Sequence, residues 1–140
     1  MIMTVNQVLD YNSIIKAIID NAKDVNVKIR FKFLGMINQF KPIVENFETI
    51  RQEKISEYGS INKDGQIGIF KPIQDDYETN TEFTEALHKY DEILAKFTKE
   101  LQEVLDADTE IEISKFKAAD IMDSGLSSDY LLALYDLIEE

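Results

Sequence analysis

Apolar residues recur with helical spacing along several segments of this chain. In the first, residues 7–21, Val8, Tyr11, Ile15 and Ile18 fall on one stripe, with Ile14 and Ile19 beside it. Asn6 precedes this segment and is the expected N-cap. Because the apolar face is broad, we expect this helix to be well buried.

The next segment fits two patterns. Residues 25–33, VNVKIRFKF, alternate as in a strand that carries Lys28, Arg30 and Lys32 on its outer face. Residues 27–58 also fit one long helix, whose register is set by Ile29, Phe33, Ile37, Phe40, Val44, Phe47, Ile55 and Tyr58. The helical pattern covers the longer stretch, so we favour it. Pro42 predicts a kink inside this helix, and Gly59 predicts its end.

A third helix is indicated after Thr79, because Glu82 completes a capping-box pattern three residues later. Its apolar positions repeat at intervals of four and three: Phe83, Leu87, Tyr90, Leu94, Phe97, Leu101 and Val104. Such a seam predicts packing against the preceding long helix in an antiparallel hairpin. We expect this pair of helices to provide most of the stability.

Three shorter elements complete the predicted fold. Asp64-Gly65 indicates a tight turn before a strand that starts at Ile67. Residues 109–114, TEIEIS, indicate a half-buried strand that could pair with IGIF or with the N-terminal IMTV. Residues 128–140 indicate an amphipathic C-terminal helix. The predicted fold class is α+β: mostly helical, with a long antiparallel helical hairpin, a small β-sheet or hairpin and the C-terminal amphipathic helix.

Composition limits the possible classes of protein. With 140 residues, 44% of them hydrophobic, we expect a single domain over residues 1–140. The sequence has no cysteine, no apolar run of about 18 residues and no basic stretch ahead of an apolar one at its start. We therefore expect no disulfides, no membrane partner and no secretion signal, and predict cytoplasmic synthesis.

Charge is distributed unevenly. The net charge is -12, which argues against direct nucleic-acid binding. Residues 23–41 nevertheless carry +4, whereas residues 100–140 carry twelve acids against two lysines. These segments could meet within one chain or between copies, so we expect a protein partner or self-association. The candidate interaction residues are Lys28, Arg30, Lys32, Tyr130, Leu131, Leu134 and Tyr135. The alternatives are a solvated basic face and a C-terminal helix that simply docks on the hairpin.

Candidate chemistry is sparse. Glu85 and His88 form a Glu-x-x-His pattern, which is half of a di-iron carboxylate site, but the predicted seam places both on the outer face of their helix. One histidine and no cysteine leave little material for a catalytic triad. We therefore expect no enzyme activity, no cofactor and no metal.

The chain resembles a family of small uncharacterised proteins encoded by tailed phages. The resemblance rests on VKIRFK at the start of the long helix, the Asp-Gly hairpin and the terminal LSSDYLLALYDLIEE. It implies an α+β fold dominated by a helical hairpin, and synthesis in an infected bacterial host. The expected function is that of a non-enzymatic structural or assembly protein associated with the virion. The alternative is a small inhibitor of a host polymerase or defence protein.

We expect calcium and EDTA to leave the melting temperature unchanged. In a calcium loop aligned on Gly65, Lys71 would occupy the position of the bidentate glutamate, where an ammonium repels the ion. Thermal melting with millimolar calcium and with EDTA tests this, and a rise of several degrees with calcium would contradict it.

Overall fold

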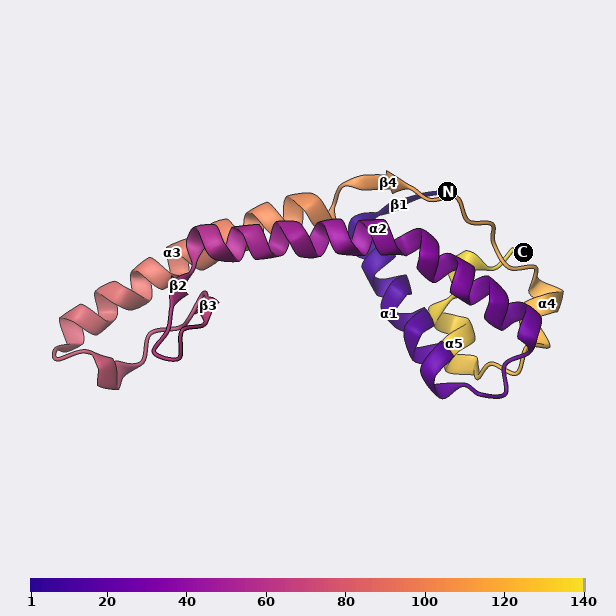
Figure 1. Cartoon of the computed structure of the whole chain (residues 1–140), viewed down its shortest axis with the longest axis horizontal. Helices are drawn as coiled ribbons and strands as arrows, with labels where there is room; N and C mark the ends of the chain where they lie inside the picture. Colours follow the sequence, from indigo (N-terminus) through magenta and orange to yellow (C-terminus); the bar gives the residue numbers. More distant parts are fainter. Residues whose placement is uncertain (140) are drawn as a thin grey trace. The chain divides into compact units, whose positions relative to one another are not determined.

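A computed structural model, which describes residues 1–139, shows a mostly helical α+β fold (Figure 1). The chain divides into two compact units, where we expected one domain. We call Met1–Glu45 together with Asp106–Glu140 the terminal unit, and Asn46–Leu105 the central unit. The helices are α1 (Val5–Asn21), α2 (Val27–Tyr58), α3 (Asn80–Leu105), α4 (Ala118–Met122) and α5 (Ser128–Ala133), with 3-10 turns η1 (Gln74–Asp76) and η2 (Tyr135–Leu137).

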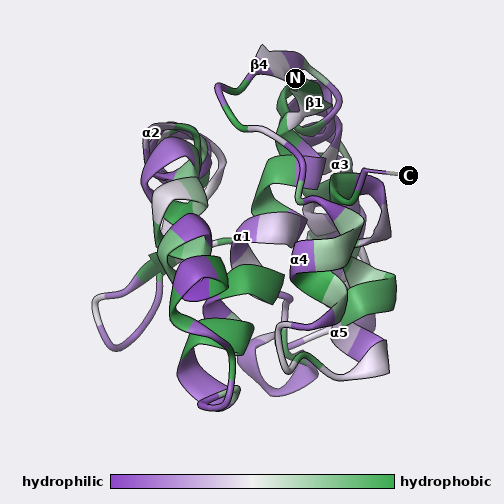
Figure 2. Cartoon of the chain, turned by 90° about the vertical axis from the view of Figure 1, so that its right-hand side faces the viewer, coloured by the Kyte–Doolittle hydropathy of each residue, from purple (hydrophilic) through white to green (hydrophobic). Residues whose placement is uncertain are grey.

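The fully buried core belongs to the terminal unit. From α1 it takes Val8, Ile15 and Ile18, and the C-terminal part of the chain supplies Ile111, Phe116, Ile121, Leu134 and Leu137. In Figure 2, α2 lies on one side of α1 and α5 on the other, and α2 carries both hydrophobic and hydrophilic residues. The core is thus built by segments from both ends of the sequence.

The long helix α2 spans Val27–Tyr58, as its helical register predicts. Its buried residues in the terminal unit are Ile29, Phe33, Met36 and Phe40, which recur at intervals of four and three. The strand interpretation of residues 25–33 is therefore wrong. The helix continues through Pro42, whose missing N–H removes a single intrahelical bond. It ends before Gly59, where an added Cβ would collide with the carbonyl oxygens of Ile55 and Gly68.

Helix α1 begins earlier than the apolar pattern indicates, because Thr4 is its N-cap and not Asn6. The Thr4 hydroxyl accepts a hydrogen bond from the Gln7 N–H at 3.2 Å, and the Gln7 side chain accepts one from the Thr4 N–H at 2.9 Å. This reciprocal pair is a capping box of the Thr-x-x-Gln type.

Two small antiparallel sheets complete the units. In the terminal unit, β1 (Ile2–Thr4) pairs with β4 (Asp108–Glu110), so the predicted strand pairs with the N-terminus and is shorter than TEIEIS. In the central unit, β2 (Ser60–Ile61) pairs with β3 (Ile67–Gly68). The turn between β2 and β3 contains Gly65 at φ 79°, a conformation that favours glycine.

The C-terminal segment is not the continuous helix that its pattern predicts. Helix α5 ends at Ala133, and η2 follows it. Ile138 is extended and forms a parallel bridge with Phe116, whose N–H donates to the Leu137 carbonyl at 2.8 Å. A helix through Ile138 would break this bridge, so pairing with Phe116 ends the helix early. Helix α5 of this segment packs on α1.

The central unit pairs the second half of α2 with α3, and the hydroxyl of Tyr58 donates to the Glu100 carboxylate at 2.8 Å between them. Among the described residues, none in α3 is fully buried, and Leu94 on the predicted seam is 36% exposed. Two helices cover each other on one side only, which leaves the seam half-buried. The residues of the seam are therefore less buried than the core of the terminal unit, and the stability expected of the pair of helices stays a prediction.

We expect Phe116→Ala to lower the free energy of unfolding by about 3–5 kcal/mol, because the ring is buried. Leu94→Ala should cost about 1 kcal/mol, since part of that side chain is already in water. His88→Ala, at an exposed position, is the control and should change the free energy by less than about 0.5 kcal/mol. Urea unfolding of the three variants tests this order, and an equal cost for Leu94→Ala and Phe116→Ala would contradict it.

Candidate interaction surfaces

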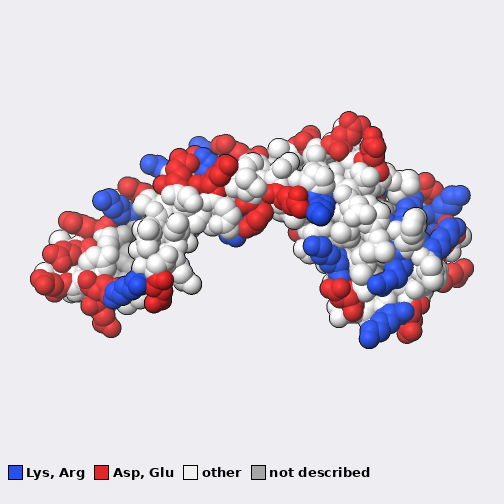
Figure 3. All heavy atoms as spheres, in the orientation of Figure 1, with Lys and Arg blue, Asp and Glu red and all other residues white. Residues whose placement is uncertain are grey.

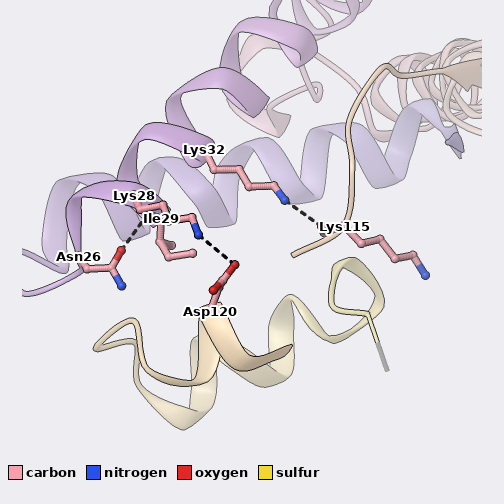
Figure 4. Close-up of polar contacts among 6 residues, drawn as sticks. All are labelled: Asn26, Lys28, Ile29, Lys32, Lys115 and Asp120. Atoms are coloured by element: carbon pink, nitrogen blue, oxygen red, sulfur yellow. Dashed lines mark hydrogen bonds and ion pairs between the residues drawn. The ribbon is translucent and has the colours of Figure 1, made fainter. Parts of the chain in front are cut away.

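The three basic candidates do not form one patch. Lys28 and Lys32 are four residues apart and share a side of α2, whereas Arg30 is rotated about 200° from each. Lys28 pairs with Asp120 at 3.3 Å, and Lys32 donates to the Lys115 carbonyl at 2.8 Å (Figure 4). Arg30 donates to the Ile19 carbonyl at 3.1 Å, near the end of α1. Basic and acidic segments thus meet within the terminal unit through one exposed ion pair.

Lys32 has a structural contact as well as a charge. Its ammonium nitrogen lies 4.5 Å from the centroid of the buried Phe116 ring, within the range of a cation–π interaction. Burial lowers the pKa of Lys32, and the nearby carboxylates of Glu139 and Asp120 oppose that shift. Lys32 therefore helps to hold the C-terminal segment on α2, and Lys28 is the freer of the two to meet a partner.

A groove of about 450 Å³ runs along this side of α2. The residues that line it come from α2 and from residues 112–114: Lys28, Phe31, Lys32, Gly35, Met36, Gln39, Glu112, Ile113 and Ser114. At Gly35, an added Cβ would meet no atom within 4 Å. Glycine weakens a helix interior, and packing within the terminal unit does not require it here. The glycine leaves the floor of the groove open.

An apolar stripe borders the groove. Val27, Phe31 and Leu34 are spaced by four and three residues on the outer side of α2, and Phe31 is 78% exposed. In Figure 3, Lys and Arg side chains gather around the part of the chain where α2 begins. We call Val27, Phe31 and Leu34 the Phe31 stripe. In the sequence, this surface is indicated by an aromatic residue, Phe31, that does not share the helical register of the buried residues.

The C-terminal candidates separate into buried and exposed residues. Leu134 is fully buried in the core and cannot contact a partner, so its assignment to an interaction surface is wrong. Tyr130 and Leu131 are partly buried and pack against the core. Tyr135 is 62% exposed, and Leu132, which sequence reasoning missed, is also exposed. The apolar stripe of this segment thus serves mainly to dock it.

The central unit carries a second exposed apolar surface on its β2–β3 hairpin. Ile61 and Ile67 are direct cross-strand partners, so their side chains lie on the same face. They are 69% and 56% exposed. The Asn62 side-chain oxygen accepts hydrogen bonds from the Asp64 and Gln66 N–H groups at 3.0 and 2.9 Å, which fixes the turn. We call this surface the Ile61–Ile67 hairpin.

The Glu-x-x-His pattern lies on one helix of the central unit. Glu85 and His88 are exposed on α3, as predicted, and His88 contacts Glu92 at 3.1 Å. They line a hollow of about 740 Å³ whose described lining residues all belong to α3, so no second element covers it. Within residues 1–139, no group of three or more metal-ligating side chains is placed to hold an ion.

Two carboxylates with lowered pKa values have structural partners. Hydrogen bonds from Arg51 and then Gln52 lower the pKa of Glu48 to about 2, far from the range suited to proton transfer at neutral pH. The Tyr58 hydroxyl, followed by Lys54, lowers the pKa of Glu100, whose second oxygen is 3.3 Å from the Lys54 nitrogen. The Glu100 carboxylate links α2 to α3.

Comparisons of the chain with protein-family profiles, with curated proteins and with solved structures each found no match. Over residues 1–139, no helix combines the length and apolar character that crossing a bilayer requires.

We expect Gly35→Ala to stabilise the protein by about 0.5–1 kcal/mol, because alanine favours a helix and its methyl group meets open space. The melting temperature should rise by about 2–4 °C. Gly59→Ala is the matched control and should lower it, since its Cβ collides with two carbonyl oxygens. Thermal melting of both variants tests this, and destabilisation by Gly35→Ala would show that the floor of the groove is tightly packed.

Proposed function

We propose that the protein is a non-enzymatic structural or assembly protein of a phage and acts through protein–protein contacts. The observation that carries the proposal is the Phe31 stripe. A phenylalanine side chain left in water loses the hydrophobic stabilisation that burial would provide, and exposed aromatic residues are typical of interfaces. Lys28 and Lys32 line the adjoining groove, and charged residues beside an apolar surface contribute to the choice of partner.

The phage assignment is supported by the resemblance of the VKIRFK, Asp-Gly and LSSDYLLALYDLIEE segments. Synthesis in the host cytoplasm, with incorporation into the virion, follows from the same resemblance. The alternative of a host-directed inhibitor uses the acidic C-terminal third as its contact surface. In the terminal unit, Asp120 of that segment already pairs with Lys28, and this favours the assembly proposal.

Mass spectrometry of purified phage particles tests the proposal. We expect the wild-type protein in stoichiometric amounts, and at least tenfold less of Phe31→Glu, because a charge on the stripe prevents burial against a partner. Ser56→Glu adds the same charge at an exposed position of the same helix and should be incorporated like the wild type. Absence of the wild-type protein from particles, together with early expression, would contradict the proposal and favour the inhibitor.

A further inference from the structure

Two of the exposed apolar surfaces described above belong to different units. The Phe31 stripe lies on α2 in the terminal unit, and the Ile61–Ile67 hairpin lies in the central unit. We propose that the Ile61–Ile67 hairpin of one copy docks on the Phe31 stripe and the adjoining groove of a second copy. This inference rests on the proposed function and names the partner of that surface.

Charge favours this pairing over the symmetric alternatives. Residues 23–41 around the stripe carry +4, whereas residues 60–78, which contain the hairpin and η1, carry four acids against two lysines. A stripe facing another stripe would bring positive charges together, and two hairpins would bring negative charges together. Because the chain has a net charge of -12, most pairs of surfaces on two copies repel each other. Residues 23–41 carry a net positive charge, so they attract an acidic surface of a second copy.

The partners of the hairpin charges strengthen the assignment. Lys63 of the turn is paired with Asp76 of η1 at 3.0 Å, which neutralises the lysine nearest to the apolar pair. Asp64 in the same turn and Asp75 in η1 are exposed. On the other surface, Lys28 is 77% exposed despite its ion pair with Asp120, so it can approach an acid of the second copy.

The shapes of the two surfaces also agree. The hairpin is narrow, with strands of two residues each, and its turn is held by the Asn62 side chain and by a backbone bond from Gly65 to Asn62 at 3.1 Å. A turn that is already ordered loses little conformational entropy on binding. The groove volume of about 450 Å³ falls in the range that accommodates a few side chains. Because Gly35 has no side chain, the hairpin of the second copy can approach the backbone of α2 closely at this position.

The contact joins two different surfaces, so it is heterologous. After one such contact, the first copy retains an unused stripe and the second copy an unused hairpin, and further copies can add until a ring closes or a filament grows. This mode of growth suits an assembly protein. It also predicts that variants of the two surfaces complement each other.

The test measures sedimentation of wild-type protein and of two variants. Wild-type protein should form concentration-dependent oligomers that weaken as salt rises. Phe31→Glu and Ile61→Glu should each be monomeric, since each lacks one of the two surfaces. Mixed in equal amounts, they should form a 1:1 heterodimer and nothing larger, because the mixture retains one intact stripe and one intact hairpin per pair.

Controls separate binding from folding. Ser56→Glu should assemble like the wild type, and circular dichroism should show unchanged helix content in every variant. If Phe31→Glu unfolds, Gly35→Leu replaces it as the stripe variant, and Ile67→Glu is the second hairpin variant. Lys28→Glu should weaken assembly at least tenfold, because it reverses an exposed charge beside the groove.

Several results would overturn the inference. A wild-type monomer at all concentrations and salt levels would do so, as would a mixture that stays monomeric. Binding of a monomeric wild type to vesicles that contain anionic lipid would instead assign the Phe31 stripe to a membrane surface. These outcomes are independent of the particle test, because a virion protein can use its stripe for a different virion subunit and still fail to complement in the mixture.

Discussion

The terminal unit depends on one contact between aromatic rings. Phe33 of α2 and Phe116 pack edge to face with centroids 5.1 Å apart, and both are buried. Phe116 also pairs through its backbone with the chain around Ile138, so this contact joins α2 to the C-terminal segment. By placing Phe33 inside, it also fixes the rotation of α2. Phe31, two residues earlier, must then face outward, and the exposed stripe is a consequence of the register that builds the core.

Helical periodicity predicted α2 well because its two patterns differ in length. Alternation covers residues 25–33 only, whereas the spacing of four and three continues through Phe40 to Tyr58. A helix also buries Ile29 and Phe33 of the alternating stretch, together with Phe40 beyond it. Periodicity did not predict where the core lies. The seam of α3 is more regular than any other segment, yet regular spacing says nothing about how many neighbours cover it. Leu94 is partly exposed because one helix faces it, while Ile121 in a five-residue helix is fully buried among several elements.

The candidate site was predicted in part, and the errors have a common cause. Lys28, Arg30 and Lys32 were grouped by sequence proximity, but a helix separates alternate residues by about 200°, and each has a different partner in the structure. Leu134 was included among the candidates because it lies on the apolar stripe of the predicted amphipathic C-terminal helix. The bridge from Ile138 to Phe116 is a pairing between residues more than twenty positions apart, and no local pattern specifies it. Phe31 was visible as an apolar residue outside the core register, but exposure follows only once that register is known.

The two units differ in burial: the terminal unit contains the fully buried core, and the central unit contains the exposed hairpin. The terminal unit holds the buried core, so an exposed phenylalanine on its surface can be tolerated without loss of the fold. In the central unit, the described residues of α3 are all at least partly exposed, and its stability is drawn from half-buried side chains and from the Glu100 contacts. Its hairpin keeps its shape through local bonds from Asn62, which do not require a large core. A ligand or partner that binds only the folded hairpin would stabilise the central unit by mass action. If the occupant is a second copy, assembly and the stability of this unit become coupled.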